Sequence, residues 1–366
     1  MKTINIGVIA MFILTLFACK TNTDKEKVSK DSEVTTKVLD PMDSFEVVAE
    51  MDLSPGNVAV SKEGRMFASI HPLRRGNLQL VEITGTTTYV PFPNAEMQST
   101  PETVSNENFD APLGVVFDNR NRLWMVDVGL VLGQTRVFAY DIDTKEELYR
   151  FDVPKELASA GSFIQDLAID EDNGFVYIAD ALVAGIVVID INNNTFRRIV
   201  DMPSMGSEDI DMIIDGEVQY FMGEPFRIAI DPITLSKDRE TLYYGAMNGT
   251  KYYKLPTKSI REGANDDIII NQIAVAGEKP LSDGAATDDN DNHYFTNVQN
   301  HSIDVLTAEG ELKTLVKHPY FDWPDSVRIH EDWLYVASNQ TNKSASVTGK
   351  EDKGVKPYRV VRFKYR

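Results

Sequence analysis

The sequence predicts an all-β fold, a six-bladed β-propeller in which each blade has four strands. Three observations predict this architecture. A pair of short apolar strands joined by a turn occurs six times, beginning at residues 57, 114, 166, 227, 284 and 326, and the period of about 50 residues is typical of propellers and solenoids. Further short strands follow most copies, which brings the number in each repeat to four. Helical periodicity is weak, so a solenoid built from helices is not expected.

The third copy shows how one repeat is organised. Asp166 to Asp170 is a short apolar strand, and Phe175 to Asp180 is the second strand after a turn. Gly185 to Asp190 and Thr195 to Val200 supply the third and fourth strands. Aromatic residues share one phase of the second strands, which predicts that they pack between blades; these residues are Trp124, Tyr177, Tyr243, Tyr294 and Tyr335.

The two ends of the folded region are expected to close the ring. Ser44 to Met51 can supply the outer strand of the first blade. Tyr358 to Tyr365 alternates between polar and apolar residues, which is typical of a strand. A propeller must join its first and last blades, and one sheet with strands from both ends would do so. The residues leave open which terminal strand closes which blade.

The first 43 residues have the pattern of processing and linker segments. An apolar run from Ile4 to Phe17 follows Lys2 and is short for a membrane span, as in a secretory signal peptide. Cys19 lies where this run ends, at the position that is lipidated in bacterial lipoproteins, so residues 1–18 are predicted to be a lipoprotein signal peptide. Residues 19–43 are polar and are predicted to form a flexible tether, which leaves 44–366 for the propeller. We therefore expect an exported protein that is anchored to the cell envelope through Cys19.

Composition narrows the possible partners. The chain has 37 Lys and Arg residues against 56 Asp and Glu residues, and phosphate binding needs clustered cations, so no nucleic-acid partner is expected. The acidity favours solubility and can also attract cations or amines. Cys19 is the only cysteine, which excludes a disulfide framework. The expected partners are a small-molecule ligand and a membrane reached through the lipid, and the protein is expected to be a monomer.

Candidate ligand-contacting residues come from the start of each innermost strand. These strands line the channel of a propeller, so their first residues converge at one mouth although they are far apart in the sequence. A ring of polar groups in an apolar scaffold is the usual layout of a small-molecule site. The ring is predicted to contain Asp166, Asp283, Asp325, Arg227, Asn57 and Gln165, with Trp323 and Phe226 as aromatic neighbours. Each polar residue could instead cap a strand end or a turn, and Asp170, Asp231 and Asp288 are interpreted as turn residues of that kind.

The six copies, taken in order, resemble the yellow/major royal jelly protein family in its bacterial branch. The matching pieces include Arg122 to Gly129 in the second blade, Ser282 to Gly284 in the fifth, and Trp323 to Asp325 with Ser338 to Gln340 in the sixth. The resemblance covers about Ser44 to Tyr365 and implies a six-bladed propeller with a ligand pocket at one end of the channel. It also implies that some members act on dopachrome or bind biogenic amines, while others are not enzymes.

Metal-dependent hydrolysis is one alternative. The propeller is also similar to that of the gluconolactonase-like families, whose members hold a metal with a Glu, two Asn and an Asp at these strand starts. Only Asp283 matches, because Gly56, Leu113 and Gln165 occupy the other three positions. We therefore predict no cofactor and no metal site, and leave Ca²⁺ or another divalent ion as an open alternative.

Three functions stay open at this point. The first is a binding protein that captures a small polar or amine-type ligand at the acidic mouth. The second is a propeller enzyme, either dopachrome tautomerase-like or gluconolactonase-like, in which crowded carboxylates raise the pKa of one Asp so that it acts as a general base. The third is a surface scaffold that contacts other proteins.

Overall fold

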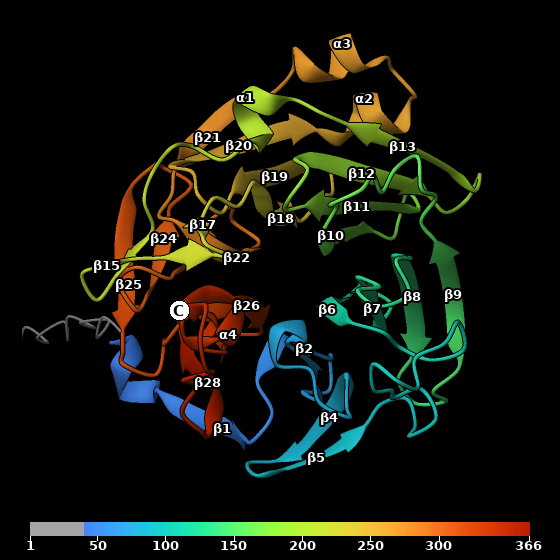
Figure 1. Ribbon diagram of the computed structural model, residues 1–366. Helices are drawn as coiled ribbons and strands as arrows, with labels where there is room; N and C mark the ends of the chain where they lie inside the picture. The colour runs from blue at the N-terminus through green and yellow to red at the C-terminus, as the bar shows by residue number, and fades with distance from the viewer. Residues whose placement is uncertain (1–39) are drawn as a thin grey trace, which may run out of the picture. The chain divides into compact units, whose positions relative to one another are not determined.

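Six antiparallel sheets of four strands form a closed ring. The computed structural model describes residues 40–366, and Figure 1 looks down the axis of the ring. The innermost strand of each blade contacts that of the next blade, and the sixth contacts the first. The predicted six-bladed propeller is therefore confirmed. The predicted signal peptide, Cys19 and most of the tether lie outside the described residues.

Each of the first five blades is built from four consecutive strands, from the innermost outward. Blade one contains β2 (Pro55–Val60), β3 (Met66–Ile70), β4 (Leu80–Gly85) and β5 (Thr88–Pro91), and blade two contains β6 (Pro112–Phe117), β7 (Arg122–Asp127), β8 (Arg136–Asp141) and β9 (Glu147–Asp152). Blade three contains β10 (Ile164–Asp170), β11 (Phe175–Asp180), β12 (Gly185–Asp190) and β13 (Thr195–Ile199). Blade four contains β18 (Ile230–Leu235), β19 (Thr241–Ala246), β20 (Lys251–Pro256) and β21 (Ala274–Glu278), and blade five contains β22 (Ser282–Thr287), β23 (His293–Asn297), β24 (Ser302–Leu306) and β25 (Leu312–Lys317).

The sixth blade closes the ring with strands from both ends of the chain. It contains β26 (Pro324–His330), β27 (Trp333–Ser338), β28 (Tyr358–Lys364) and, outermost, β1 (Glu46–Met51). The prediction that this N-terminal strand belongs to the first blade is wrong, because β5 already supplies the outer strand there. Antiparallel pairing sets Glu46 opposite Arg362 and Glu50 opposite Arg359, with N–O distances of 2.7 and 3.1 Å. Opposite charges across the pair support this register.

Apolar side chains between neighbouring blades form the core. Blades one and two enclose Phe67, Phe92 and Phe138, while blades three and four enclose Tyr177 and Tyr244. The five aromatic residues of the second strands are all buried within such clusters, as predicted; they are Trp124, Tyr177, Tyr243, Tyr294 and Tyr335. Close packing between blades therefore fixes the ring on which the channel depends.

A β-bulge lies near the start of every innermost strand. The pairing register of β10 with β11 shifts between Ile164 and Leu167, and the other five innermost strands shift at the matching position. A bulge leaves residues out of the ladder and changes the direction of their side chains. In five blades the bulge encloses two residues, which we call the mouth pair of that blade; in the sixth blade the bulge encloses Asp325, and the pair is Asp325 with Ser326, which follows it.

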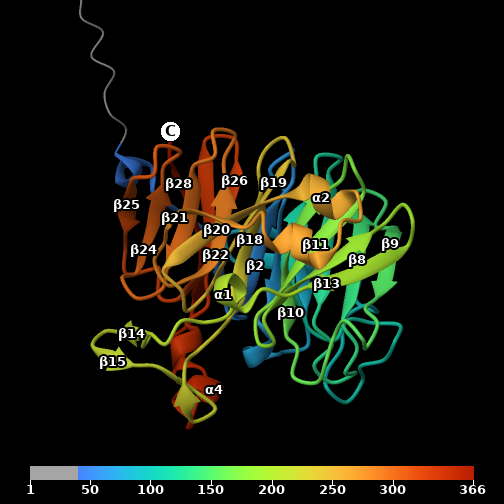
Figure 2. The same ribbon diagram turned by 90° about the horizontal axis from the view of Figure 1, so that it is seen from above.

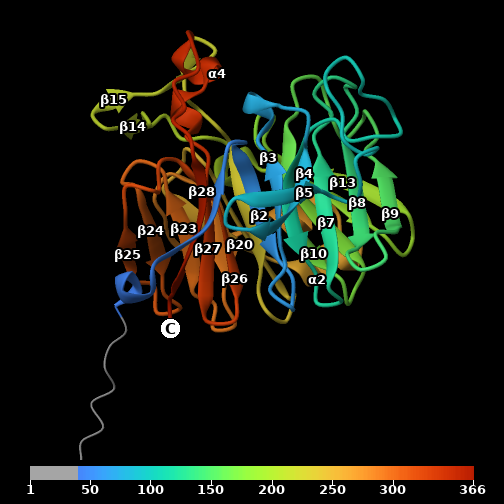
Figure 3. The same cartoon turned by 90° about the horizontal axis from the view of Figure 1, so that it is seen from below.

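Additional segments cover one mouth of the channel. They comprise β14 (Ile213–Ile214), β15 (Glu217–Val218), β16 (Tyr220–Phe221), β17 (Glu224–Pro225) and α4 (Ala345–Thr348). Figures 2 and 3 show β14, β15 and α4 on the side of the propeller away from the C terminus. The remaining short helices are η1 (Pro41–Ser44), η2 (Pro72–Arg74), α1 (Met202–Met205), α2 (Thr257–Arg261), α3 (Asp266–Ile270) and η3 (Thr341–Lys343). No helix among residues 40–366 is long and apolar enough to cross a membrane.

Two glycines of the mouth pairs allow neighbouring blades to approach closely. A Cβ atom on Gly284 would lie 2.4 Å from the carbonyl oxygen of Asp325, and one on Gly114 would lie 2.2 Å from that of Gln165. Each glycine therefore lets the backbone of the next mouth pair lie against it.

We expect Gly284→Ala to lower the free energy of unfolding by roughly 1–3 kcal/mol, because a backbone oxygen cannot move aside as a flexible side chain can. Thermal unfolding measures the effect. Gly76→Ala is the control, since its Cβ would meet only a terminal methyl of Leu53, at 3.3 Å. Equal melting temperatures for the two variants would contradict the close approach.

Candidate functional site

The mouth pairs converge at the channel, as the sequence predicts for five blades out of six. Bulge positions assign the pairs as Gly56-Asn57, Leu113-Gly114, Gln165-Asp166, Asp231-Pro232, Asp283-Gly284 and Asp325-Ser326. Polar side chains from five blades meet there, and the exposure of Asn57, Gln165, Asp166, Asp231, Asp283 and Asp325 ranges from 1% to 8%.

The fourth blade corrects the prediction. Arg227 precedes β18, and its guanidinium pairs with Asp209 and Asp211 at 2.9 and 2.7 Å rather than with the mouth residues. Asp231, which we interpreted as a turn residue, occupies the mouth pair and is 1% exposed. Asp170 and Asp288 do cap turns, as predicted, by accepting hydrogen bonds from Asn173 and Asn292.

The spacing of the repeats contains a signal for Asp231. The interval from Gly114 to Trp124 is 10 residues and that from Asp166 to Tyr177 is 11. The predicted start of the fourth copy, Arg227, is 16 residues before Tyr243, whereas Pro232 is 11 residues before it. A spacing of 10 or 11 residues to the aromatic residue therefore identifies the correct pair.

A small cavity of about 90 Å³ lies directly above the mouth pairs. Its polar lining consists of the carboxyl groups of Asp231, Asp283 and Asp325, together with Gln165, His71 and Thr341. Its apolar walls include Phe163, Phe221, Phe226, Trp323, Leu182 and Met247. None of the described residues that line it is a lysine or an arginine.

Trp323 joins the carboxyl cluster to the aromatic wall. Its indole Nε1 donates a hydrogen bond to Asp283 Oδ2 at 2.6 Å, and its ring lies 5.4 Å from that of Phe226 at an angle of 61°. The backbone φ of Trp323 is +55°, which is rare for a bulky residue and costs about 1–3 kcal/mol. Such strain persists where the surroundings impose it, and it gathers at binding sites.

The segment from Met212 to Phe226 forms the roof of the cavity with α4. Met212, Ile214, Phe226 and Trp323 pack with Val347 of α4 in one buried cluster. The amide of Met222 also donates a hydrogen bond to the carbonyl of Ser346 at 3.2 Å. This segment therefore lies over the cavity and is held there by α4.

The four carboxyl groups of the channel all have raised pKa values. Burial is the main cause for each, because it disfavours the charged form. The pKa of Asp166 rises to about 6 and that of Asp283 to about 8, while the pKa values of Asp231 and Asp325 lie well above the usual range. Repulsion between neighbours adds to burial, since the charges of Asp283 and Asp166 both raise the pKa of Asp231.

Two carboxylate oxygens in this cluster accept no hydrogen bond from an N–H or hydroxyl group of the described residues, although the side chains of Asp231 and Asp283 can share a proton. They are Asp231 Oδ2 and Asp166 Oδ1, and both are buried. The second oxygen of Asp231 accepts a hydrogen bond from Gln165 Nε2 at 2.5 Å. Unpaired buried oxygens are unfavourable, so the cluster has capacity for a donor or a positive charge from outside the protein.

His71 was missed by the sequence reasoning. Its Nδ1 accepts a hydrogen bond from the amide of Leu73 at 3.2 Å, which assigns the ring proton to Nε2. That Nε2 lies 3.6 Å from Asp325 Oδ2 and lines the cavity. Burial lowers the pKa of His71 to about 3, so the ring is neutral and supplies a donor rather than a charge. No spacing in the sequence places His71 at the mouth.

Arg328, also missed, lies in the channel beyond the mouth pairs. Its Nη2 donates to Asn57 Oδ1, and Asn57 Nδ2 donates to Asp325 Oδ1 at 3.2 Å. Asp166 Oδ1 is 3.8 Å from the same Nη2. The guanidinium that balances the cluster therefore belongs to Arg328 and not to Arg227. A charged residue within the short apolar strand of the sixth copy was the available signal.

Within residues 40–366, no group of three or more His, Cys, Asp or Glu side chains is arranged to hold a metal ion. Gly56, Leu113 and Gln165 do occupy mouth pairs, where the lactonase-type enzymes have metal ligands. The carboxyl groups of the mouth can take part in acid–base and electrostatic chemistry.

Sequence comparison identifies relatives of known family. Residues 111–358, more than half of the chain, match the family described as Major royal jelly protein. The yellow-related salivary protein SP04 of Phlebotomus argentipes is 32% identical over 181 residues, covering 42% of this chain and 44% of that protein. Major royal jelly protein 7 of Apis mellifera is 24% identical over 157 residues, covering 39% of this chain and 34% of that protein. Protein yellow of Drosophila melanogaster is 22% identical over 196 residues, covering 49% of this chain and 36% of that protein. The matched part spans less than half of each relative.

Solved structures agree on the fold. Virginiamycin B lyase from Staphylococcus aureus superposes with a TM-score of 0.51 at 12% identity, covering 87% of this chain and 99% of that chain. A protein of unknown function from Bacteroides thetaiotaomicron superposes with a TM-score of 0.53 at 9% identity, covering 88% of this chain and 75% of that chain. Identities this low show the fold alone. The family match, together with the six-bladed ring, shows that this chain belongs to the major royal jelly protein family.

Proposed function

We propose that this protein binds a small amine at the covered mouth of its propeller. The observation that carries the proposal is the lining of the cavity, where three carboxyl groups face one small space without a lysine or arginine. Buried carboxylates need a positive partner, and a ligand ammonium supplies the charge that the described lining residues lack.

The hydrogen-bonding pattern also favours an ammonium group. Asp231 Oδ2 accepts no hydrogen bond from an N–H or hydroxyl group of the described residues, and the carboxyl group of Asp283 faces the same cavity. A primary ammonium has three N–H donors and no acceptor, so it can bond to several carboxylate oxygens at once. A ligand carboxylate at this position would meet like charges instead.

The aromatic wall favours a flat apolar body next to the amine. Phe163, Phe221 and Phe226 line the cavity beside the carboxyl groups, and an aromatic face also attracts a cation. The volume of about 90 Å³ lies below the roughly 300 Å³ at which drug-sized pockets begin. The cavity therefore holds the ammonium and the adjoining carbons, and the body of the ligand contacts the roof formed by Phe221 and Leu182.

Three compounds that share a phenylethyl body test the proposal: 2-phenylethylamine, 2-phenylethanol and 3-phenylpropionate. Calorimetry at about pH 9, where most of the amine and, with its pKa of about 8, Asp283 are charged, is expected to show at least ~10-fold tighter binding of the amine than of the alcohol. Equal affinity for the amine and the alcohol would show that apolar contact alone drives binding. No binding of the amine would leave the scaffold hypothesis as the better account.

Catalysis is a second candidate, favoured by one observation. Asp283 lines the cavity, and burial raises its pKa to about 8, which suits a general acid or base near neutral pH. The loss of dopachrome absorbance, measured with and without protein, tests it. A rate with the wild-type protein that exceeds the uncatalysed rate, and that returns to the uncatalysed rate with Asp283→Asn, supports a tautomerase. If the wild-type protein does not accelerate the reaction, this candidate function is excluded.

We also propose that the protein is exported and anchored to the cell envelope through a lipid on Cys19, on the basis of the apolar run that ends at this residue. Metabolic labelling with a radioactive fatty acid, followed by membrane fractionation, tests the anchor. Labelling of the wild type but not of Cys19→Ser supports it, and an unlabelled wild-type protein in the soluble fraction contradicts it.

A further inference from the structure

A second and larger cavity opens at the other mouth of the channel, where the innermost strands end. Its volume is about 480 Å³, within the range of roughly 300–1,000 Å³ that is typical of small-molecule pockets. Arg366 at the C terminus lines it, and Figures 2 and 3 place the C terminus on the side away from α4. The two cavities therefore lie at opposite ends of the propeller.

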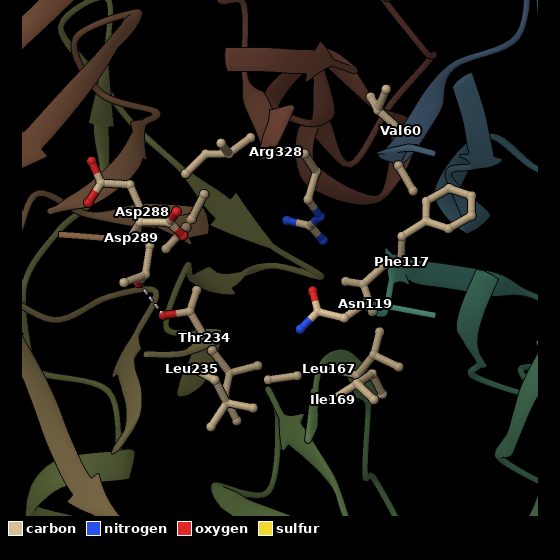
Figure 4. A pocket seen from close by; sticks show the side chains of 18 of the residues that line it. Val60, Phe117, Asn119, Leu167, Ile169, Thr234, Leu235, Asp288, Asp289 and Arg328 are labelled. Carbon is tan, nitrogen blue, oxygen red and sulfur yellow. Dashed lines mark hydrogen bonds between the residues drawn. The ribbon is translucent and has the colours of Figure 1, made fainter. Parts of the chain in front are cut away.

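Apolar side chains form the walls of this second cavity. They include Val60, Phe117, Leu167, Ile169, Leu235 and Ile329, which come from five different blades. Figure 4 shows Val60, Phe117, Leu167, Ile169 and Leu235 around an open centre, with the side chains of Arg328 and Asn119 directed into it. The walls suit an apolar body of a ligand, and the polar groups at the centre can orient it.

The floor of the cavity contains one cationic side chain, that of Arg328, with short side chains around it. Five blades place a small or β-branched residue two positions after the second residue of the mouth pair; these residues are Ala59, Val116, Ala168, Thr234 and Ala286. The sixth blade places Arg328 there. Five short side chains therefore leave space around the single guanidinium of the ring.

The hydrogen bonds of Arg328 leave one donor for a ligand. Its Nε and Nη2 both donate to the carbonyl of Val115 at 3.3 Å, Nη1 donates to the carbonyl of Val327 at 3.0 Å, and Nη2 donates to Asn57 Oδ1. A guanidinium has five N–H groups, so one N–H of Nη1 has no acceptor among the described residues. The side chain is 15% exposed, and Asp166 is 3.8 Å away.

Charged groups at the rim are already compensated. Arg239 pairs with Glu171 at 3.2 Å, and Arg366 pairs with Asp332 at 2.9 Å. Lys237 pairs with Asp289 at 2.6 Å. Asp288 accepts hydrogen bonds from its own turn, and Glu331 is exposed to solvent. Arg328 is thus the cation that an anion entering this cavity meets at its floor.

We propose that this cavity is a second binding site, for a small monocarboxylate with a compact apolar body, whose carboxylate contacts Arg328 while the body fills the apolar walls. A guanidinium matches the planar geometry of a carboxylate. The site is separate in space from the amine site, because its lining residues lie at the opposite mouth, although Asn57 links Arg328 to Asp325.

The compounds with a phenylethyl body also test this site. We expect 3-phenylpropionate to bind at least ~10-fold more tightly than 2-phenylethanol, and to shift the NMR signals of the methyl groups of Leu167 and Ile233. 2-Phenylethylamine is expected to shift those of Leu182 and Ile228 at the covered mouth. The acid and the amine should bind together without competition. Competition between them, or signals of Leu182 that respond to the acid, would overturn the proposal.

Two kinds of variant test the contacts. Arg328→Lys keeps the charge and should retain part of the affinity for 3-phenylpropionate, whereas Arg328→Met should reduce it at least ~10-fold. Val116→Phe extends a half-buried wall residue into the cavity and leaves Arg328 intact, so it remains informative if the Arg328 variants do not fold. The Val116→Phe substitution should weaken the binding of 3-phenylpropionate and leave the affinity for 2-phenylethylamine unchanged. Unchanged affinity for the acid in Val116→Phe, or no binding of the acid to the wild type at about 10 mM, would contradict the site.

Discussion

Replacing Asp283 with Asn is expected to weaken the binding of 2-phenylethylamine by at least about 30-fold near pH 9, because removing one partner of a desolvated charge pair costs ~2 kcal/mol or more. Asparagine retains the shape of the side chain and an oxygen that can accept the hydrogen bond from Trp323 Nε1. The change therefore removes the charge with little effect on packing. Calorimetric titration of both proteins measures the difference.

Asp209→Asn is the matched control for this effect. Its carboxylate is fully exposed and pairs with Arg227, outside the cavity. The variant loses the same formal charge as Asp283→Asn, so any general electrostatic effect is common to both. We expect the affinity of Asp209→Asn for the amine to equal that of the wild type. A similar loss in both variants would show that net charge, and not the cavity, attracts the amine.

The second large effect is on stability as the pH changes. The pKa of Asp283 in the folded protein is about 8, above its value in the unfolded chain, so the folded state binds more protons between about pH 4 and 8. The stability that this carboxyl contributes is complete below pH 4 and is lost as the pH rises through 8. The wild type should therefore lose stability relative to Asp283→Asn, by up to about 1.4 kcal/mol for each pH unit in this range.

Other buried groups make the comparison with the variant necessary. Burial lowers the pKa of His71 to about 3 and that of His293 to about 4, which removes stability as the pH falls below 6.5. Burial also lowers the pKa of Lys279 to about 7, which adds stability as the pH rises above that value. Both proteins share these effects, so they cancel in the difference. Melting temperatures of the wild type and Asp283→Asn from about pH 5 to 9 measure this difference in stability. A difference that does not change with pH would contradict the raised pKa of Asp283.

The ring of blades was predictable because it depends on local patterns that repeat. Short apolar strands and turns occur in each copy, and most copies have an aromatic residue at a similar spacing, such as Tyr177 after Asp166; these patterns are visible without a structure. The same regularity placed Asp283 and Asp325 at one mouth. The closing strand was misplaced because Glu46 to Met51 has no feature that distinguishes the first blade from the sixth.

The fourth blade was misread for a physical reason. Arg227 to Asp231 has the pattern of an innermost strand, while the true strand contains Pro232, which ordinarily argues against a strand in the interior of a sheet. The bulge resolves the conflict: the register shifts between Ile230 and Ile233, so Pro232 lies where the ladder needs no N–H donor. Helices α2 and α3 were not predicted because five residues are too few to show a helical period.

The polar network inside the channel was the least predictable part of the site. Arg328 meets Asn57 across 271 positions of sequence, and His71 meets Asp325 across the junction of the first and last blades. Such contacts depend on ring closure and on the residues that surround each side chain. The sequence supplies the residue types, and only the fold brings them together.

The most direct test of the amine site is the number of protons exchanged when the amine binds. Titration of the wild type with 2-phenylethylamine at about pH 7, in two buffers with different heats of ionisation, gives this number. Asp283, whose pKa is about 8, is largely protonated at that pH in the free protein and must ionise to pair with an ammonium, and burial raises the pKa values of Asp231 and Asp325 in the same direction. We therefore predict net proton release, and less release in Asp283→Asn. Binding of the amine with no proton exchange, or with proton uptake, would contradict a site formed by buried, protonated carboxyl groups.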